Sequence, residues 1–163
     1  MSSIDSTDIL VSLRRIIRSI NLESKRIQKE HGVSIPQLLC LKHLKDCKDF
    51  RASSKDLCSY LQLNASTVTG IIKRLEKKGL LAKLPKTGDK RLTLVVLTSP
   101  GAELLDNIPA LQHDRLAQRL QLLPGDELEN MSATIDKIVD LMDASGIDAS
   151  PLLTGEEQLS NAS

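Results

Sequence analysis

The sequence has 163 residues, of which 40% are hydrophobic and 26% are charged, and its formal net charge is +1. This composition predicts one folded domain, or two small ones packed together, and excludes a chain that is disordered throughout. Phe50 and Tyr60 are the only aromatic residues, which argues against aromatic cages, base-stacking RNA-binding sheets and aromatic-lined peptide grooves.

Cysteine count and hydropathy predict a soluble, cytoplasmic protein. Cys40, Cys47 and Cys58 cannot all pair within one chain, and they lack the spacing of metal ligands. The N-terminal residues do not follow the basic-then-apolar layout of a secretion signal. No apolar run approaches the roughly 20 residues that cross a bilayer, so no membrane association is expected.

The small net charge conceals an uneven distribution along the chain. Residues 64–99 carry eight Lys/Arg and two Asp/Glu, a balance of +6, whereas residues 1–63 have a balance of +4 and residues 100–163 one of −9. A concentrated basic segment indicates a polyanionic partner. A merely solvated basic face is the alternative, and charge alone does not separate the two.

The first part of the chain has helical spacing. Residues 8–30 carry Ile and Leu at intervals of three and four, which predicts an amphipathic helix that ends at Gly32. Ser34 followed by Pro36 predicts the capped start of a second helix, which frays over residues 45–51.

Two shorter helices are predicted next. The third begins at Ser53 or Ser54, and the fourth spans residues 65–78, with Asn64 as its N-cap and Gly79 at its end. The side chains that these helices are expected to bury are Leu57, Tyr60, Leu61, Val68, Ile71, Ile72 and Leu75.

The hydrophobic pattern then changes to that of strands. Residues 80–84 and 92–97 are short and rich in Leu and Val, and the basic, Gly-containing residues 85–91 separate them, which predicts a hairpin.

The C-terminal third is again helical in pattern. Residues 98–120 predict a helix that is kinked at Pro109. A last helix begins at residues 124–126 and carries an apolar seam suited to packing on other helices. Residues 146–163 predict a flexible tail.

The order of helix, helix, short turn, helix and basic hairpin is that of a winged helix-turn-helix. An α-helix fits the DNA major groove with its N-terminal residues facing base edges, and a basic wing reaches the neighbouring minor groove. Hydroxyl and small residues begin the fourth helix, and basic residues follow one turn later and in the wing. The candidate DNA-binding residues are Asn64, Ser66, Thr67, Thr69, Gly70, Lys73, Arg74, Lys86, Lys90 and Arg91.

Three segments at characteristic spacing resemble the MarR family of bacterial transcriptional regulators. They are residues 63–69 continuing into 74–80, residues 89–91, and residues 97–101. The resemblance implies a mainly α fold with a small β-hairpin wing, in which a winged helix-turn-helix lobe (residues 34–98) joins a helical dimerisation domain (residues 1–33 and 99–145).

The resemblance also implies a function and further site residues. A homodimer would bind a pseudo-palindromic operator, most often as a repressor, and a small amphipathic or phenolic effector would release it. In the family an acidic residue of the wing holds its shape while an Arg enters the minor groove, which implies these roles for Asp89 and Arg91. Lys90 and Gly70 depart from the usual pattern, and Gly70 offers no side chain for reading bases.

Long apolar seams on the terminal helices support the dimer independently, because a lobe of about 60 residues buries only about 60% of its unfolded surface. A dimeric winged-helix module that binds proteins and not DNA is the alternative function.

The family resemblance implies that the effector binds in a crevice between the winged lobe and the dimerisation helices. The residues proposed to line this effector crevice are Arg14, His43 and Leu104.

No other chemistry is predicted. The sequence has no nucleophile elbow, phosphate-binding loop or metalloprotease motif, so neither an enzyme nor a cofactor is expected. His31, His43 and His113 form no close zinc-binding pair. Peroxide sensing by a cysteine is a minor alternative. Peroxide-sensing members of the family have their reactive cysteine near the N-terminal helix, and the N-terminal helix predicted here contains no cysteine.

Overall fold

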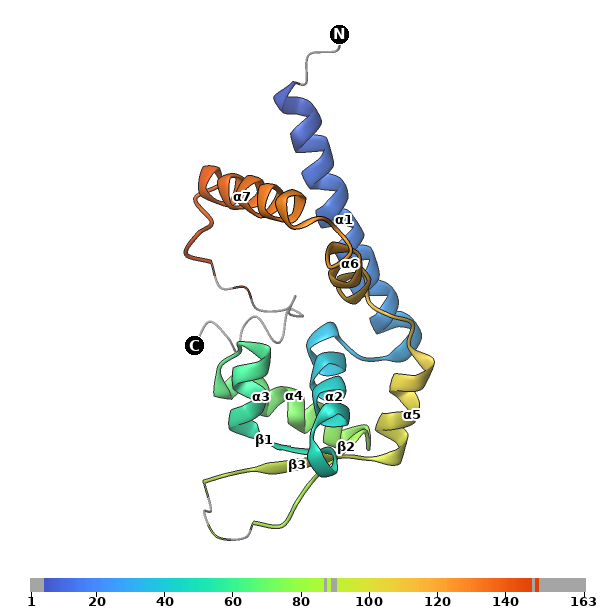
Figure 1. Ribbon diagram of the computed structural model, residues 1–163. Helices are drawn as coiled ribbons and strands as arrows, with labels where there is room; N and C mark the ends of the chain where they lie inside the picture. Colours follow the sequence, from blue (N-terminus) through green and yellow to red (C-terminus); the bar gives the residue numbers. More distant parts are fainter. Residues whose placement is uncertain (1–4, 87, 89–90, 148, 150–163) are drawn as a thin grey trace. The chain divides into compact units, whose positions relative to one another are not determined.

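The computed structural model describes residues 5–147 and 149, apart from residues 87, 89 and 90, as a largely helical chain with three short strands (Figure 1). Its elements are α1 (Ser6–His31), α2 (Ile35–Asp46), the 3₁₀ turn η1 (Lys48–Phe50), β1 (Arg51–Ser53), α3 (Ser54–Leu61), α4 (Ala65–Lys77), β2 (Leu81–Lys83), β3 (Leu94–Leu97), α5 (Ser99–Asn107), α6 (Gln112–Leu120) and α7 (Gly125–Leu141).

Local capping residues define where the first helices begin and end. Gly32 follows α1 with a φ of 70°, a left-handed conformation that glycine adopts without a Cβ clash. The Ser34 Oγ accepts a hydrogen bond from the Gln37 amide at 3.3 Å and so caps α2. Both boundaries agree with the prediction from the sequence.

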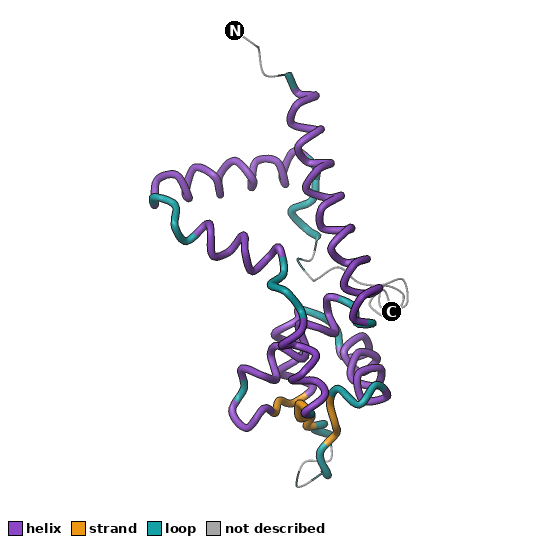
Figure 2. The backbone as a smooth tube through the Cα atoms, turned by 90° about the vertical axis from the view of Figure 1, so that its right-hand side faces the viewer, coloured by secondary structure: helices purple, strands orange, loops and turns teal. Residues whose placement is uncertain are grey.

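The segment after α2 differs from the fraying that the sequence predicted. It forms the turn η1, in which Asp49 has a φ of 55°, and then the strand β1. β1 pairs antiparallel with β3, and β2 pairs with the other side of β3, so the sheet order is β1-β3-β2. The strands are drawn in orange in Figure 2. β1 was missed because its three residues show no hydrophobic period, and pairing with β3 is what makes them a strand.

The core of the winged lobe is formed by leucine and β-branched side chains from α2, α3, α4 and the sheet. The fully buried large side chains in these elements are Leu38, Leu41, Leu44, Leu57, Leu61, Val68, Ile71, Leu75 and Leu81. Tyr60 was expected among them, and that prediction is wrong, because the side chain is 48% exposed and stacks on the His43 ring at 4.2 Å.

Thr98 and Gly101 join the end of α4, the β2–β3 hairpin and the start of α5. The Thr98 Oγ1 donates to the Gly79 carbonyl at 2.6 Å and accepts from the Gly101 amide at 3.2 Å, which caps α5. A Cβ on Gly101 would lie 2.1 Å from the Leu80 carbonyl oxygen. Only glycine therefore allows this approach of α5 to the start of the hairpin.

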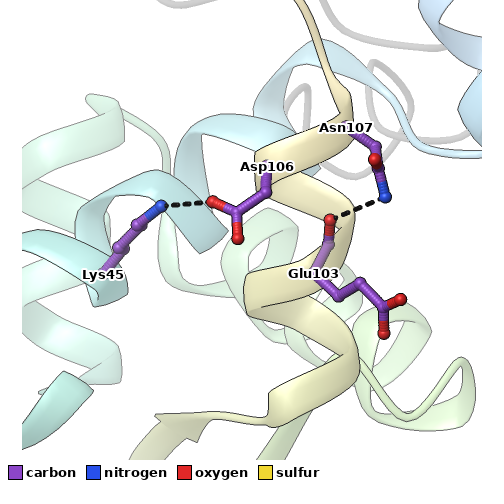
Figure 3. A network of polar contacts seen from close by, with 4 residues as sticks. All are labelled: Lys45, Glu103, Asp106 and Asn107. Atoms are coloured by element: carbon purple, nitrogen blue, oxygen red, sulfur yellow. Dashed lines mark hydrogen bonds and ion pairs between the residues drawn. The ribbon is translucent and has the colours of Figure 1, made fainter.

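An ion pair also connects α5 with α2. The Lys45 Nζ lies 2.9 Å from the Asp106 Oδ1, and on the same helix the Asn107 Nδ2 donates to the Glu103 carbonyl (Figure 3). Both charged side chains are largely solvated, so the pair contributes at most about 1 kcal/mol.

The predicted helix over residues 98–120 is two helices and not one kinked helix. α5 ends at Asn107 and α6 begins at Gln112. Ile108, which precedes Pro109, is extended (φ −93°, ψ 126°), as expected because the proline ring disfavours helical backbone at the residue before it. The described residues divide into two units at this break, which lies between Pro109 and Ala110.

The C-terminal helix begins at Gly125, as predicted, directly after Pro124. Of the predicted tail, residues 148 and 150–163 lie outside the described residues. Within the part of the chain that the structure describes, no helix is both long enough and apolar enough to span a bilayer.

Candidate nucleic-acid interface

The α4 helix has a capped N-terminus and one buried side. The Asn64 Oδ1 accepts a hydrogen bond from the Thr67 amide at 2.8 Å, as the predicted N-cap should. The buried residues of α4 are Thr67, Val68, Ile71, Ile72 and Leu75. The predicted apolar stripe is confirmed, and it fixes which side of α4 faces away from the core.

The opposite side of α4 carries the polar candidates. Ser66, Thr69 and Lys73 are exposed, whereas Gly70 and Arg74 are half-buried. The Thr69 Oγ1 donates to the Ala65 carbonyl at 2.7 Å, so its hydroxyl hydrogen is already used within the helix.

Thr67 does not belong to this outer surface. Its side chain is 0% exposed, and a group inside the lobe cannot contact a DNA groove. The sequence placed it with Ser66 and Thr69 because all three are small hydroxyl residues in the first two turns. Lys77, by contrast, was not among the candidates, although it is exposed four residues after Lys73 and so lies on the same side of the helix.

The C-terminal half of α4 is tied to its surroundings by two lysines. Glu76, the one acidic residue of α4, lies 3.1 Å from the Lys83 Nζ of β2. The Lys78 Nζ donates to the Gly32 carbonyl at the end of α1. The first contact neutralises the only negative charge of the helix, and both contacts hold α4 against its neighbours.

The wing connects β2 with β3 and carries further positive charge. Lys86 and Arg91 are exposed, and Gly88 has a φ of 80°, as expected of a turn. The predicted residues Asp89 and Lys90 lie outside the described residues, so the shape-holding role of Asp89 stays a prediction.

The three cysteines are free thiols in different surroundings. Burial raises the pKa of the Cys40 thiol to about 12 and also raises the pKa of Cys58. Cys58, expected in the core, is only half-buried, and the Cys47 Sγ lies 3.5 Å from the His43 Nε2. The described residues include no group of three or more His, Cys, Asp or Glu side chains that could hold a metal ion.

A cavity of about 310 Å³ lies beside the second half of α1, and it is an open one. Its lining residues are Ser24, Lys25, Gln28, Lys29 and Ser34. Arg14, His43 and Leu104, the residues proposed for an effector crevice, are not part of this lining.

Together, these elements define a winged-helix lobe: α3 and α4 form the helix-turn-helix, and the β2–β3 hairpin forms the wing. The sequence profile of the MarR family matches residues 33–93, which span this lobe. The HTH-type transcriptional regulator YkoM of Bacillus subtilis is 30% identical over 125 residues, 76% of this chain and 79% of YkoM. The chain belongs to the MarR family of transcriptional regulators.

Other relatives agree with this assignment. The HTH-type transcriptional repressor MdtR of Bacillus subtilis is 28% identical over 122 residues, 75% of this chain and 77% of MdtR. Among solved structures, the DNA complex of MepR from S. aureus has a TM-score of 0.62 at 19% identity, covering 85% of this chain and 98% of MepR. That similarity shows the same fold.

Proposed function

We propose that this protein is a DNA-binding transcriptional repressor that binds a pseudo-palindromic operator as a homodimer. The observation that carries the proposal is the coincidence of shape and charge on one lobe. The outer side of α4 is polar and basic, its single acid is paired with Lys83, and the adjacent wing exposes Lys86 and Arg91.

This arrangement matches the chemistry of a DNA duplex. A helix with a polar outer side can enter the major groove, where Ser66 and Thr69 would face bases or phosphates. Lys73 would neutralise phosphate charge, and Arg91 would enter the minor groove, whose negative potential attracts arginine. MepR and the Streptomyces coelicolor regulator Sco3205, which share this fold, have been solved with DNA.

Exposed apolar side chains on the terminal helices support the homodimer. In α1 they are 42–55% exposed and comprise Ile9, Leu10, Ile16, Ile17, Ile20 and Leu22. In α6 and α7 they comprise Leu116, Leu128, Met131, Ile135 and Leu141. Such faces mark association surfaces, so residues 1–33 and 99–145 are proposed as the dimerisation domain. A two-fold dimer would present its recognition helices to half-sites roughly 34 Å apart.

Release by a small amphipathic or phenolic effector is part of the same proposal, and the family resemblance supports it. A regulator of chromosomal genes would act in the cytoplasm. Adding a phenolic carboxylate to the protein–DNA complex tests the release, which appears as a fall in bound DNA.

Electrophoretic mobility shift with a randomised duplex library tests DNA binding, and sedimentation of the free protein tests the dimer. The proposal expects retarded duplexes, an affinity that falls steeply with salt, and a two-chain species. Unchanged mobility at every salt concentration would instead favour the dimeric protein-interaction module. A protein that sediments as a single chain would contradict the proposed homodimer, and with it the binding of a pseudo-palindromic operator.

A further inference from the structure

The space above Gly70 on the outer side of α4 is filled by the side chain of Arg74. A Cβ built on Gly70 would lie 3.5 Å from both the Nη1 and the Nη2 of Arg74, and 3.8 Å from its Cζ. The two terminal nitrogens of the guanidinium therefore lie nearest the glycine, at ordinary van der Waals distance from where a side chain would begin.

Helix geometry explains this placement. Side chains of an α-helix lean toward its N-terminus, so a residue covers the turn that precedes its own Cα. Arg74 is one turn after Gly70 and lies at the boundary between the buried and outer sides of α4, which is why it is half-buried. By lying over Gly70, its guanidinium is carried onto the outer side and toward the turn of Ser66 and Thr69. Arg74 also takes part in a further interaction, so it is not without a partner.

The other candidate groups of the helix are less suited to paired hydrogen bonds with a base. The Asn64 Oδ1 caps the helix, Thr67 is buried, and the Thr69 hydroxyl hydrogen is donated to a main-chain carbonyl. Lys73 and Lys77 present point charges, which suit phosphates better than the paired acceptors of a base.

We infer that Arg74, positioned by Gly70, is the base-reading group of the recognition helix and that it reads a guanine in each half-site. The planar guanidinium donates two parallel hydrogen bonds, and guanine offers the matching O6 and N7 acceptors in the major groove. Gly70 thus contributes space. Because it has no side chain, the side chain of Arg74, which begins one turn later in the helix, can occupy the surface above it. This inference rests on the proposed DNA binding.

Selection from a randomised duplex library, followed by sequencing of the bound fraction, tests the assignment. We expect the unaltered protein to select a motif with one guanine per half-site that depends on Arg74. Arg74→Lys keeps the charge and loses the paired donors, so the preference for that guanine should fall roughly 5- to 150-fold while duplex binding persists. Lys77→Ala, which removes a charge from the same side of the helix, should leave the motif unchanged.

The outcomes distinguish a failure of the proposed DNA binding from a failure of the role assigned to Arg74. If the unaltered protein selects no motif and binds no duplex, the proposed function fails. If it selects a motif and Arg74→Lys selects the same motif with undiminished guanine preference, the role of Arg74 is overturned and the proposed function stands.

Substitutions of Gly70 test the positioning. Gly70→Ala should be tolerated, because its Cβ meets Arg74 at an ordinary contact distance. Gly70→Leu fills the space of the guanidinium and should remove the guanine preference, and helix formation is not at risk because leucine is a better helix former than glycine. In an Arg74→Ala background, where the guanine preference is already absent, the same leucine should cause no further loss of duplex affinity. An equal loss of duplex affinity in both backgrounds would show that leucine acts on DNA directly, which would overturn the positioning by Gly70.

Discussion

Gly101→Ala should destabilise the winged lobe, because the new methyl group has no space. Its Cβ would lie 2.1 Å from the Leu80 carbonyl oxygen and 2.8 Å from the Leu97 Cδ1. The leucine side chain can rotate, but the carbonyl belongs to the backbone between α4 and β2 and accepts a hydrogen bond from the Thr98 amide at 3.3 Å. Relief of the clash must therefore move backbone and weaken that bond.

The expected loss is about 2 kcal/mol, the middle of a range of about 0.5–4 kcal/mol. Overpacking typically costs about 1–3 kcal/mol, and a weakened hydrogen bond adds about 0.5–1.5 kcal/mol. Alanine returns about 0.5–1 kcal/mol because it is a better helix former than glycine. Against a total stability of about 5–15 kcal/mol, this loss is large enough to measure clearly.

Urea unfolding followed by circular dichroism would measure this loss, with Gly70→Ala as the matched control. Gly70 is also a helical glycine of the same unit, but its added Cβ makes only ordinary contacts, so its variant should be neutral or slightly more stable. Equal midpoints for the two variants would show that the junction at Leu80 adapts freely and that the steric reasoning is wrong.

Four further predictions concern single side chains. Ser53→Ala removes the Oγ that accepts from the Asp56 amide at 3.0 Å, and should lower the free energy of unfolding by about 0.5–2 kcal/mol in a urea titration. Lys73→Ala should reduce the slope of log affinity against log salt by about 1.8, or about 0.9 for each subunit of the dimer, and an unaltered slope would contradict its phosphate contact. Arg91→Ala should weaken operator binding by about 1–3 kcal/mol by fluorescence anisotropy without changing the sedimentation of the dimer; unaltered affinity would contradict its minor-groove role. Iodoacetamide at pH 8 should modify Cys47 well before Cys40 in the native protein, since Cys40 is buried with a pKa of about 12; equal rates by mass spectrometry would contradict that burial.

Features determined by local chemistry could be predicted from the sequence. Ser34, Asn64 and Gly79 mark helix ends in the structure as expected, because caps depend on a residue and its nearest neighbours. The apolar side of α4 follows from helical spacing alone. The family membership could be inferred for the same reason, since its motifs lie in this locally determined region.

Features that depend on distant partners could not be predicted in this way. β1 exists because Ala52 pairs with Val95, more than forty residues later in the chain. Tyr60 remains 48% exposed and stacks on the His43 ring, which belongs to a different helix. Within α4 itself, residue type could not show that Thr67 turns inward, or that Arg74 lies over Gly70, because both depend on how the helix packs.

The motif of residues 97–101 shows that a family pattern can mark architecture as well as DNA contact. Thr98 binds the Gly79 carbonyl through its hydroxyl and the Leu80 carbonyl through its amide, while Gly101 packs against the same Leu80. The end of the recognition helix, the beginning of the wing and the start of α5 therefore meet at two consecutive residues. A change at this junction would alter the position of the wing relative to α4, so residues that need not touch DNA are placed to control whether helix and wing fit one duplex together.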